Sequence, residues 1–307
     1  MGASGWLADG SGVMPFCVLL EIALQPCGWL AAYAGSALRS KKDLKFRNLG
    51  GKANVHANLP CGEHALTMRT RLTKVAEAAD MIIEDFDFEV LSQGRPIYTG
   101  STNFGFFTAQ ALSQQVGLRD AHYTPSKDDE AQANEQALDD TPPWVPEAAP
   151  KGAIFRPDGL RMPAKALRMI DAIDLFNPNG GPHGLGYVRG YKIVDPAEWF
   201  FKAHFFQDPV CPGSLGVESF LQLLKFAAMQ RWPQYARSHR FEMLCDRHEW
   251  QYRGQIIPSN RKVVVDAVIT RVEEGDAPLL MADGWLQVDH LYIYRMSQFG
   301  LRLVPIN

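Results

Sequence analysis

The chain has 307 residues, of which 46% are hydrophobic and 21% charged, and its formal net charge is −3 at pH 7. This composition excludes a disordered, collagen-like or coiled-coil protein, and the length suits about two domains. The absence of a basic excess argues against a nucleic-acid partner. Five cysteines without a C-x-x-C pair favour a reducing cytoplasm and no metal site.

The first predicted element is a long apolar helix over residues 15–40, interrupted at Pro26. Proline suits the first turn of a helix, where its missing N–H has no partner in any case. The run is long enough to suggest a membrane span, but an ionised Glu21 near its centre would cost about 3 kcal/mol in lipid. We therefore predict a buried helix of a soluble protein and no membrane span.

Strands are predicted over residues 44–108, where short β-branched and aromatic runs are broken by glycine and proline. Residues 126–150 are acidic, rich in alanine and proline, and nearly without aliphatic side chains, which predicts a linker. Beyond it, residues 186–206 and 262–294 again favour strands, the first of them ending near His204. A second long helix is expected over residues 212–230.

The two predicted helices share a spacing that indicates an internal repeat. Glu21 and Gln25 follow Pro15 as Glu218 and Gln222 follow Pro212, 197 positions later. Two further matches stand 195 positions apart: Lys45-Phe46 with Arg240-Phe241, and Asn103-Phe104-Gly105 with Gln298-Phe299-Gly300. Four matches in one order predict two related α+β units.

The domain organisation follows from this repeat. We expect a first unit over residues 1–108, a linker over 109–155 and a second unit over 156–307. The first unit has far fewer residues before its helix, so we expect it to be shortened at its N-terminus. An unpaired sheet edge there would favour a homodimer.

The most reactive constellation surrounds His204, which stands shortly before the second helix. Histidine titrates near neutral pH and is a common general base. The amides of Gly213 and Ser214 open the helix, where unpaired N–H groups and partial positive charge can hold a carbonyl oxygen. The residues alone leave open whether His204 is catalytic or bonded within the core.

Three sequence stretches resemble the signature of the hotdog-fold β-hydroxyacyl-ACP dehydratases, closest to the 3-hydroxydecanoyl-ACP dehydratase branch. They are Gly180-Gly-Pro-His-Gly-Leu-Gly-Tyr-Val, Asp195-Pro-Ala-Glu-Trp-Phe-Phe-Lys-Ala-His204-Phe and Asp208-Pro-Val-Cys-Pro-Gly213. The first helix further resembles the tandem dehydratase region of polyunsaturated fatty acid synthases. The resemblance implies an α+β double hotdog, with two antiparallel sheets each wrapped around a long helix.

The resemblance also implies a site shared between two hotdogs. His204 and the Gly213 amide would come from the second unit, and the catalytic acid would be Glu21 of the first. Glu218 is the alternative acid or part of a vestigial second site, because the position matching His204 in the first unit is Leu7. Other members of the branch carry aspartate where this chain has glutamate. The side chains implied to line the substrate site are Gln25, Phe205, Cys211, Ser214 and Gln222.

The implied reaction is dehydration of a 3-hydroxyacyl thioester to the 2-enoyl thioester, in some relatives with isomerisation of the double bond. His204 would take the α-proton, and the Gly213 amide would hold the enolate oxygen. Glu21 would be kept protonated by its apolar neighbours and would protonate the leaving hydroxyl. The implied partners are an acyl carrier protein, whose phosphopantetheine carries the substrate, and other domains of a fatty acid or polyketide-type synthase. No metal or other cofactor is implied. A non-catalytic hotdog scaffold and a hotdog thioesterase remain open alternatives.

Overall fold

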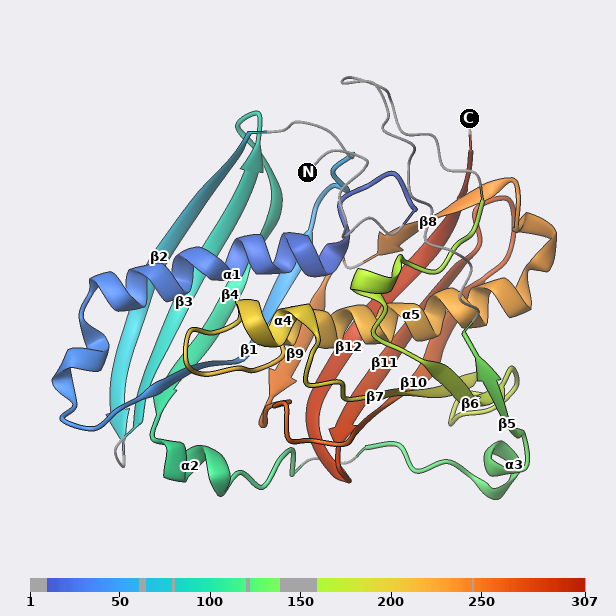
Figure 1. Cartoon of the computed structure of the whole chain (residues 1–307). Coiled ribbons are helices and arrows are strands. Elements are labelled where there is room, and N and C mark those ends of the chain that lie inside the picture. Colours follow the sequence, from blue (N-terminus) through green and yellow to red (C-terminus); the bar gives the residue numbers. More distant parts are fainter. Residues whose placement is uncertain are drawn as a thin grey trace.

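One long antiparallel sheet and two long helices dominate the computed structural model (Figure 1), which describes residues 10–60, 65–78, 81–119, 122–138, 159–244 and 246–306. The strands are β1 (Lys45–Val55), β2 (Leu66–Ala78), β3 (Met81–Ser92), β4 (Arg95–Phe107), β5 (Ala133–Ala137), β6 (Ala172–Asn177), β7 (Tyr187–Ile193), β8 (His239–Leu244), β9 (His248–Tyr252), β10 (Lys262–Glu273), β11 (Leu279–Val288) and β12 (Leu291–Pro305). The long helices are α1 (Phe16–Tyr33) and α5 (Gly213–Arg231), and the short ones are α2 (Ala109–Ser113), α3 (Lys127–Glu130), α4 (Trp199–Ala203), η1 (Ser36–Arg39), η2 (Lys165–Leu167) and η3 (Pro233–Tyr235).

The strands form a single sheet in the order β2-β3-β4-β1-β9-β12-β11-β10-β7-β6-β5, and β8 pairs with β12 as a branch. The strands predicted in residues 44–108 are confirmed as β1 to β4, which form one end of the sheet. Those of the second unit form the rest. The two parts meet where β1 pairs with β9 over four residue pairs, from Gly50 opposite Gln251 to Ala53 opposite His248.

Helix α1 begins directly after Pro15, as the sequence predicts, but it continues through Pro26 without interruption. Its buried side chains are apolar, and they pack against β2, β3 and α5. Among the described residues, the stretch Phe16–Arg39 is the one helical segment long and apolar enough to cross a membrane by length and composition alone. The core helix of a soluble protein passes the same test.

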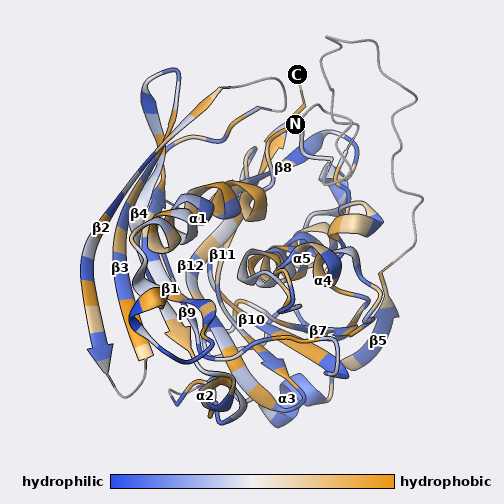
Figure 2. Cartoon of the chain, turned by 60° about the vertical axis from the view of Figure 1, so that its left-hand side comes forward, coloured by the Kyte–Doolittle hydropathy of each residue, from blue (hydrophilic) through white to orange (hydrophobic). Residues whose placement is uncertain are grey.

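Helix α5 begins directly after Pro212, with a backbone conformation at that proline close to the one at Pro15. Fifteen consecutive residues, Ser214–Ala228, are buried, including the polar Glu218 and Lys225. The helix packs against β7, β10, β11 and β12. In Figure 2 both long helices lie on the same side of the curved sheet. Hydrophobic side chains of the sheet and of both helices are buried in one core cluster.

Two predicted elements are wrong. The aromatic run that precedes His204 forms helix α4 instead of a strand, and His204 follows as its C-cap residue. The acidic segment predicted as a linker folds in part, because residues 127–130 form α3 and residues 133–137 form β5, which pairs with β6. Asp129 anchors this segment, since its buried carboxylate accepts hydrogen bonds from Tyr123 and Asn177. Residues 139–158, which include the rest of the predicted linker, lie outside the described residues.

Candidate active site

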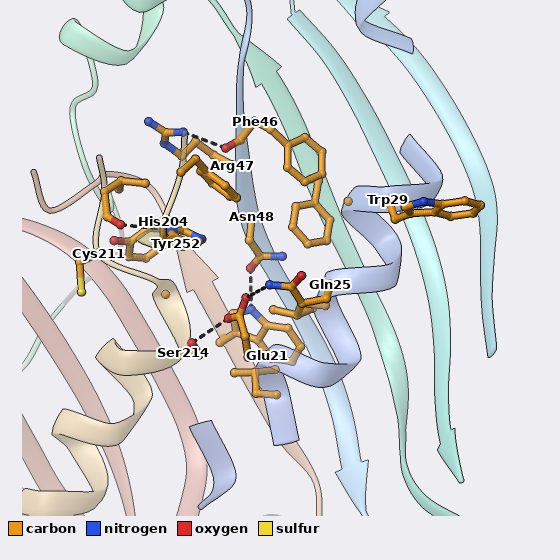
Figure 3. A pocket seen from close by; sticks show the side chains of 18 of the residues that line it. Glu21, Gln25, Trp29, Phe46, Arg47, Asn48, His204, Cys211, Ser214 and Tyr252 are labelled. Carbon is orange, nitrogen blue, oxygen red and sulfur yellow. Dashed lines mark hydrogen bonds between the residues drawn. The ribbon is translucent and has the colours of Figure 1, made fainter. Parts of the chain in front are cut away.

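A cavity of about 410 Å³ opens between the two long helices, where β1, β4, β9 and the loop after α4 come together. It is lined by residues that lie more than 150 positions apart in sequence, among them Glu21 of α1 and His204 (Figure 3). The seam between β1 and β9 runs along its floor, where Trp250 donates a hydrogen bond of 2.9 Å to the side-chain oxygen of Asn48. The cavity is therefore composite, with walls from both predicted units.

The imidazole of His204 is held in one orientation. Its Nδ1 lies 2.9 Å from the carbonyl oxygen of Val210, and its ring packs against Phe205 with 3.8 Å between ring centroids. A carbonyl oxygen only accepts hydrogen bonds, so Nδ1 carries the hydrogen in the neutral ring. This tautomer leaves the lone pair on Nε2, which is the nitrogen that a general base would use.

Glu21 projects from α1 into the same cavity, as the repeat and the resemblance predict. Its Oε1 accepts a hydrogen bond of 2.9 Å from Gln25, one turn further along the helix. Its Oε2 accepts a hydrogen bond of 2.9 Å from the hydroxyl of Ser214, which belongs to α5. Both oxygens of Glu21 are thus held, and one of the bonds crosses between the helices (Figure 3).

The N-terminus of α5 forms the third wall. Gly213 lines the cavity, and a side chain added there would meet nothing within 4 Å, so its backbone is open to an approaching ligand. The N-cap residue is Pro212, whose ring offers no capping group, and the first amides of a helix have no partner within the helix. Cys211 lines the cavity beside them, and burial raises the pKa of its thiol to about 12.

A partly buried ion pair joins the loop after His204 to the first unit. The guanidinium of Arg47 in β1 is 5% exposed and makes two hydrogen bonds, of 2.7 and 2.9 Å, to the carboxylate of Asp208. Gln255 accepts two further bonds from the same guanidinium. Burial raises the pKa of Asp208, but the hydrogen bonds and charge of Arg47 outweigh it and hold that pKa below its ordinary value.

Of the nine residues that the sequence predicts for the site, seven line the cavity and two do not. Gln25, Phe205, Cys211 and Ser214 all line the cavity. Glu218 and Gln222 do not line it. Instead, Gln222 donates a hydrogen bond of 3.0 Å to Glu218 within the buried part of α5, and also accepts one from the amide of Met169. Leu7, the position that matches His204, lies outside the described residues.

For several lining residues, no sequence pattern indicated a place in the site. They are the residues brought in by the strands: Phe46, Arg47 and Asn48 of β1, Phe104 and Phe106 of β4, Trp250 and Tyr252 of β9, and Tyr294 of β12. Strand pairing fixes their position, and it joins residues far apart in sequence. In the described part of the chain, no group of three or more His, Cys, Asp or Glu side chains is placed to hold a metal ion.

The second unit is similar to a known domain family. Residues 162–297, which include His204 and α5, match the model of that family. This stretch is a FabA-like domain. The FabA-like domain thus supplies His204, Gly213 and Ser214 to the cavity, whereas Glu21 comes from the preceding part of the chain.

A related protein matches nearly the whole chain. It is a component of the polyunsaturated fatty acid synthase of Thraustochytrium sp., and it is 31% identical over 318 residues, which cover 98% of this chain. The chain spans 21% of the length of that relative. The resemblance predicted from the sequence, to FabA-like dehydratases and polyunsaturated fatty acid synthases, is confirmed.

Solved structures share the fold at low sequence identity. The 12:0-ACP thioesterase from Umbellularia californica has a TM-score of 0.51 and 10% identity, covering 99% of this chain and 92% of its own. An acyl-ACP thioesterase from Bacteroides thetaiotaomicron has a TM-score of 0.50 and 11% identity, covering 99% and 95%. A large antiparallel sheet with a long helix across it is the hotdog arrangement, and at these identities the likeness extends to the fold alone.

Proposed function

We propose that this chain removes water from 3-hydroxyacyl thioesters to give 2-enoyl thioesters in fatty acid biosynthesis. The observation that carries the proposal is the meeting of three groups in one cavity: His204, with its lone pair on Nε2, Glu21 and the open backbone of Gly213. A base, an acid and amide donors are the groups that this elimination needs. The FabA-like domain and the synthase relative support the same reaction class.

In the proposed mechanism His204 Nε2 removes the α-proton of the thioester, and the electrons of the broken C–H bond form the carbon–carbon double bond. The hydroxyl on the β-carbon leaves as water with a proton from Glu21. The amides at the start of α5 hold the thioester oxygen while it carries negative charge. At the end His204 is protonated and Glu21 ionised, and exchange with water resets both groups.

Ser214 and Gln25 position the acid in this mechanism. A hydroxyl can donate or accept, so Ser214 can remain bonded to Glu21 both when the carboxyl group is protonated and when it is ionised. The bond from Gln25 fixes the other oxygen of Glu21. Together they keep the carboxyl group directed into the cavity across the helix interface.

The composite cavity also supports the double-hotdog interpretation of the sheet. We take β1 to β4 with α1 as the first hotdog and the FabA-like part with α5 as the second, joined at β1 and β9. On this interpretation the chain has one complete site. Glu218 would belong to the second, incomplete site, because it lies buried beside Lys225 instead of in the cavity.

The synthase relative supports a wider setting for the chain. We propose that it works in the cytoplasm as part of a fatty acid synthase, without a membrane span, nucleic-acid partner, metal or resident cofactor. The substrate would arrive on the phosphopantetheine of an acyl carrier protein. Association of two copies as a homodimer belongs to the same proposal.

The proposal is tested by following a 3-hydroxyacyl thioester and its products by mass spectrometry with wild type, His204→Ala, Glu21→Gln and Glu218→Gln. Dehydration should fall by a factor of about 10²–10⁴ without His204 or the Glu21 acid, and stay within about threefold of wild type in Glu218→Gln. Circular dichroism checks that each variant is folded.

Three results would contradict the proposal. Free acid and thiol as products would indicate a thioesterase. A folded wild type that is inert toward every chain length would indicate a scaffold. Loss of dehydration in Glu218→Gln but not in Glu21→Gln would place the site within the second unit.

A further inference from the structure

Two tyrosines in the wall of the cavity have hydroxyl groups without a partner. Tyr252 of β9 (Figure 3) and Tyr294 of β12 both line the cavity, and they are 6% and 1% exposed. Among the described residues, none forms a hydrogen bond with either hydroxyl. A buried tyrosine hydroxyl usually has a partner, because leaving it unbonded costs free energy.

The other two buried tyrosines of the described chain show this usual arrangement. The hydroxyl of Tyr98 lies 3.0 Å from Nε2 of His248, and that of Tyr187 donates a hydrogen bond to the carboxylate of Asp266. Neither tyrosine lines the cavity. The hydroxyls without a partner are thus the two at the cavity wall, which indicates that a ligand in the cavity supplies the missing acceptor.

Tyr252 stands near the start of α5. Its ring packs edge-on against Tyr294, with 4.9 Å between ring centroids, and Tyr294 fits against α5 at Gly216, where an added Cβ would lie 2.7 Å from its ring. The thiol of Cys211, two residues before Gly213, is close enough to affect the pKa of Tyr252. Tyr252 is also the more exposed of the two tyrosines, so its hydroxyl is the better placed to reach a ligand held at Gly213.

The hydroxyl of Tyr252 is a hydrogen-bond donor at neutral pH. Burial raises the pKa of this phenol above its ordinary value of 10, and the charge of Arg47 lowers it by less. The hydroxyl therefore keeps its hydrogen. A fixed donor in a site that excludes water stabilises the reaction most where negative charge develops, and in the proposed elimination that place is the thioester oxygen.

We propose that the hydroxyl of Tyr252 donates a hydrogen bond to the thioester oxygen of the substrate, beside the amides at the start of α5. Tyr252 is then a further catalytic residue, supplied by β9 at the seam of the sheet, and Tyr294 supports its ring. This inference rests on the proposed function and deepens it, because it adds a side-chain donor to the backbone amides that hold the charged oxygen.

The test compares wild type, Tyr252→Phe, Tyr294→Phe and Tyr187→Phe in the dehydration of a ten-carbon 3-hydroxyacyl N-acetylcysteamine thioester. Tyr252→Phe should lower kcat by about 10² and leave KM within about threefold of wild type, because the bond strengthens as charge develops on the oxygen. Tyr187→Phe removes the same atom from a tyrosine outside the cavity, so it is the matched control and should keep kcat within about threefold. An unchanged kcat in Tyr252→Phe, or a larger loss in Tyr294→Phe, would overturn the inference.

Urea unfolding distinguishes a catalytic from a structural role of the hydroxyl. Tyr252→Phe removes a hydroxyl that has no partner in the protein, so its unfolding midpoint should equal or exceed that of wild type. Tyr187→Phe removes a hydrogen bond that is made and should lower the midpoint. A midpoint of Tyr252→Phe as low as that of Tyr187→Phe would show a structural partner and would also overturn the inference.

Infrared spectroscopy separates this inference from the reaction itself. The probe is a saturated ten-carbon N-acetylcysteamine thioester with ¹³C at the thioester carbonyl, which has no hydroxyl to eliminate. A hydrogen bond lowers the stretching frequency of a carbonyl group, so the band of the bound probe should lie at higher frequency in Tyr252→Phe than in wild type. An identical band in both proteins would overturn the inference even if dehydration is observed, whereas the shift without dehydration by wild type would refute the proposed function and leave the contact of Tyr252 with the thioester standing.

Discussion

The ion pair between Arg47 and Asp208 should hold the His204 loop against the first unit. Removing one partner of a buried ion pair typically costs about 3–5 kcal/mol, because the other charge is left uncompensated. The side chain of Asp208 is 19% exposed and that of Arg47 5%, so water relieves part of this penalty. We expect Asp208→Asn to lower the free energy of unfolding by about 2–3 kcal/mol.

A double-mutant cycle measures the pair itself. Urea unfolding of wild type, Asp208→Asn, Arg47→Met and the double variant should give a coupling energy of about 2 kcal/mol. The matched control is Asp87→Asn, which breaks the exposed ion pair with Arg71 and should change stability by less than about 1 kcal/mol. Additive effects of the two single variants, or a loss at Asp208 no larger than that at Asp87, would refute the reasoning.

The pH dependence of this pair has a definite sign. Since Arg47 holds the pKa of Asp208 below its ordinary value of 3.8, the folded state favours the ionised carboxylate. The stabilisation is present above about pH 4 and is lost as the pH falls through the lowered value. Wild type should therefore lose more stability than Asp208→Asn in unfolding experiments below pH 4.

Three further predictions concern single side chains. Burial raises the pKa of Cys211 to about 12, so iodoacetamide at pH 8 should modify it only after unfolding, and rapid labelling of the native protein would contradict this. Burial raises the pKa of Asp266 from 3.8 to about 6, so the folded state favours the protonated carboxyl group. The free energy of unfolding should therefore fall by up to about 3 kcal/mol as the pH rises from 4 to 6. Asp266→Asn should abolish this pH dependence in urea titrations. Pro26→Ala should raise the free energy of unfolding by about 1 kcal/mol, because it restores a helical N–H donor in α1. A lower free energy of unfolding in urea would contradict this.

The sequence predicted the parts of the site that local patterns specify. Proline followed by an apolar run marked both long helices, and the repeat placed Glu21 and Glu218 at matching positions before any contact was known. The motif around His204 identified the histidine and Gly213. Apart from the repeat, which compares positions 195 to 197 residues apart, each of these signals lies within about twenty consecutive residues.

The rest of the site depends on pairing across the sheet. Arg47 of β1 meets Asp208 of the loop after α4 where the two parts of the chain come together, and no local pattern contains both residues. The acidic segment was misjudged for another reason: its composition suggests a linker, but Ser126 and Asp129 form a capping box that starts α3. Helix α4 was missed because its aromatic side chains favour strands, and its N-cap residue, Glu198, makes no side-chain capping hydrogen bond.

The seam between β1 and β9 gives the molecule a point of vulnerability at its active site. Four residue pairs join β1 to β9 there and four more join β9 to β12, whereas β1 pairs with β4 over ten. A small hinge opening at this seam would move Glu21 away from His204 without unwinding either helix. The proposed dehydration would then depend on the docking of the two halves, and mild denaturant or tension along the chain would stop it while most secondary structure remained.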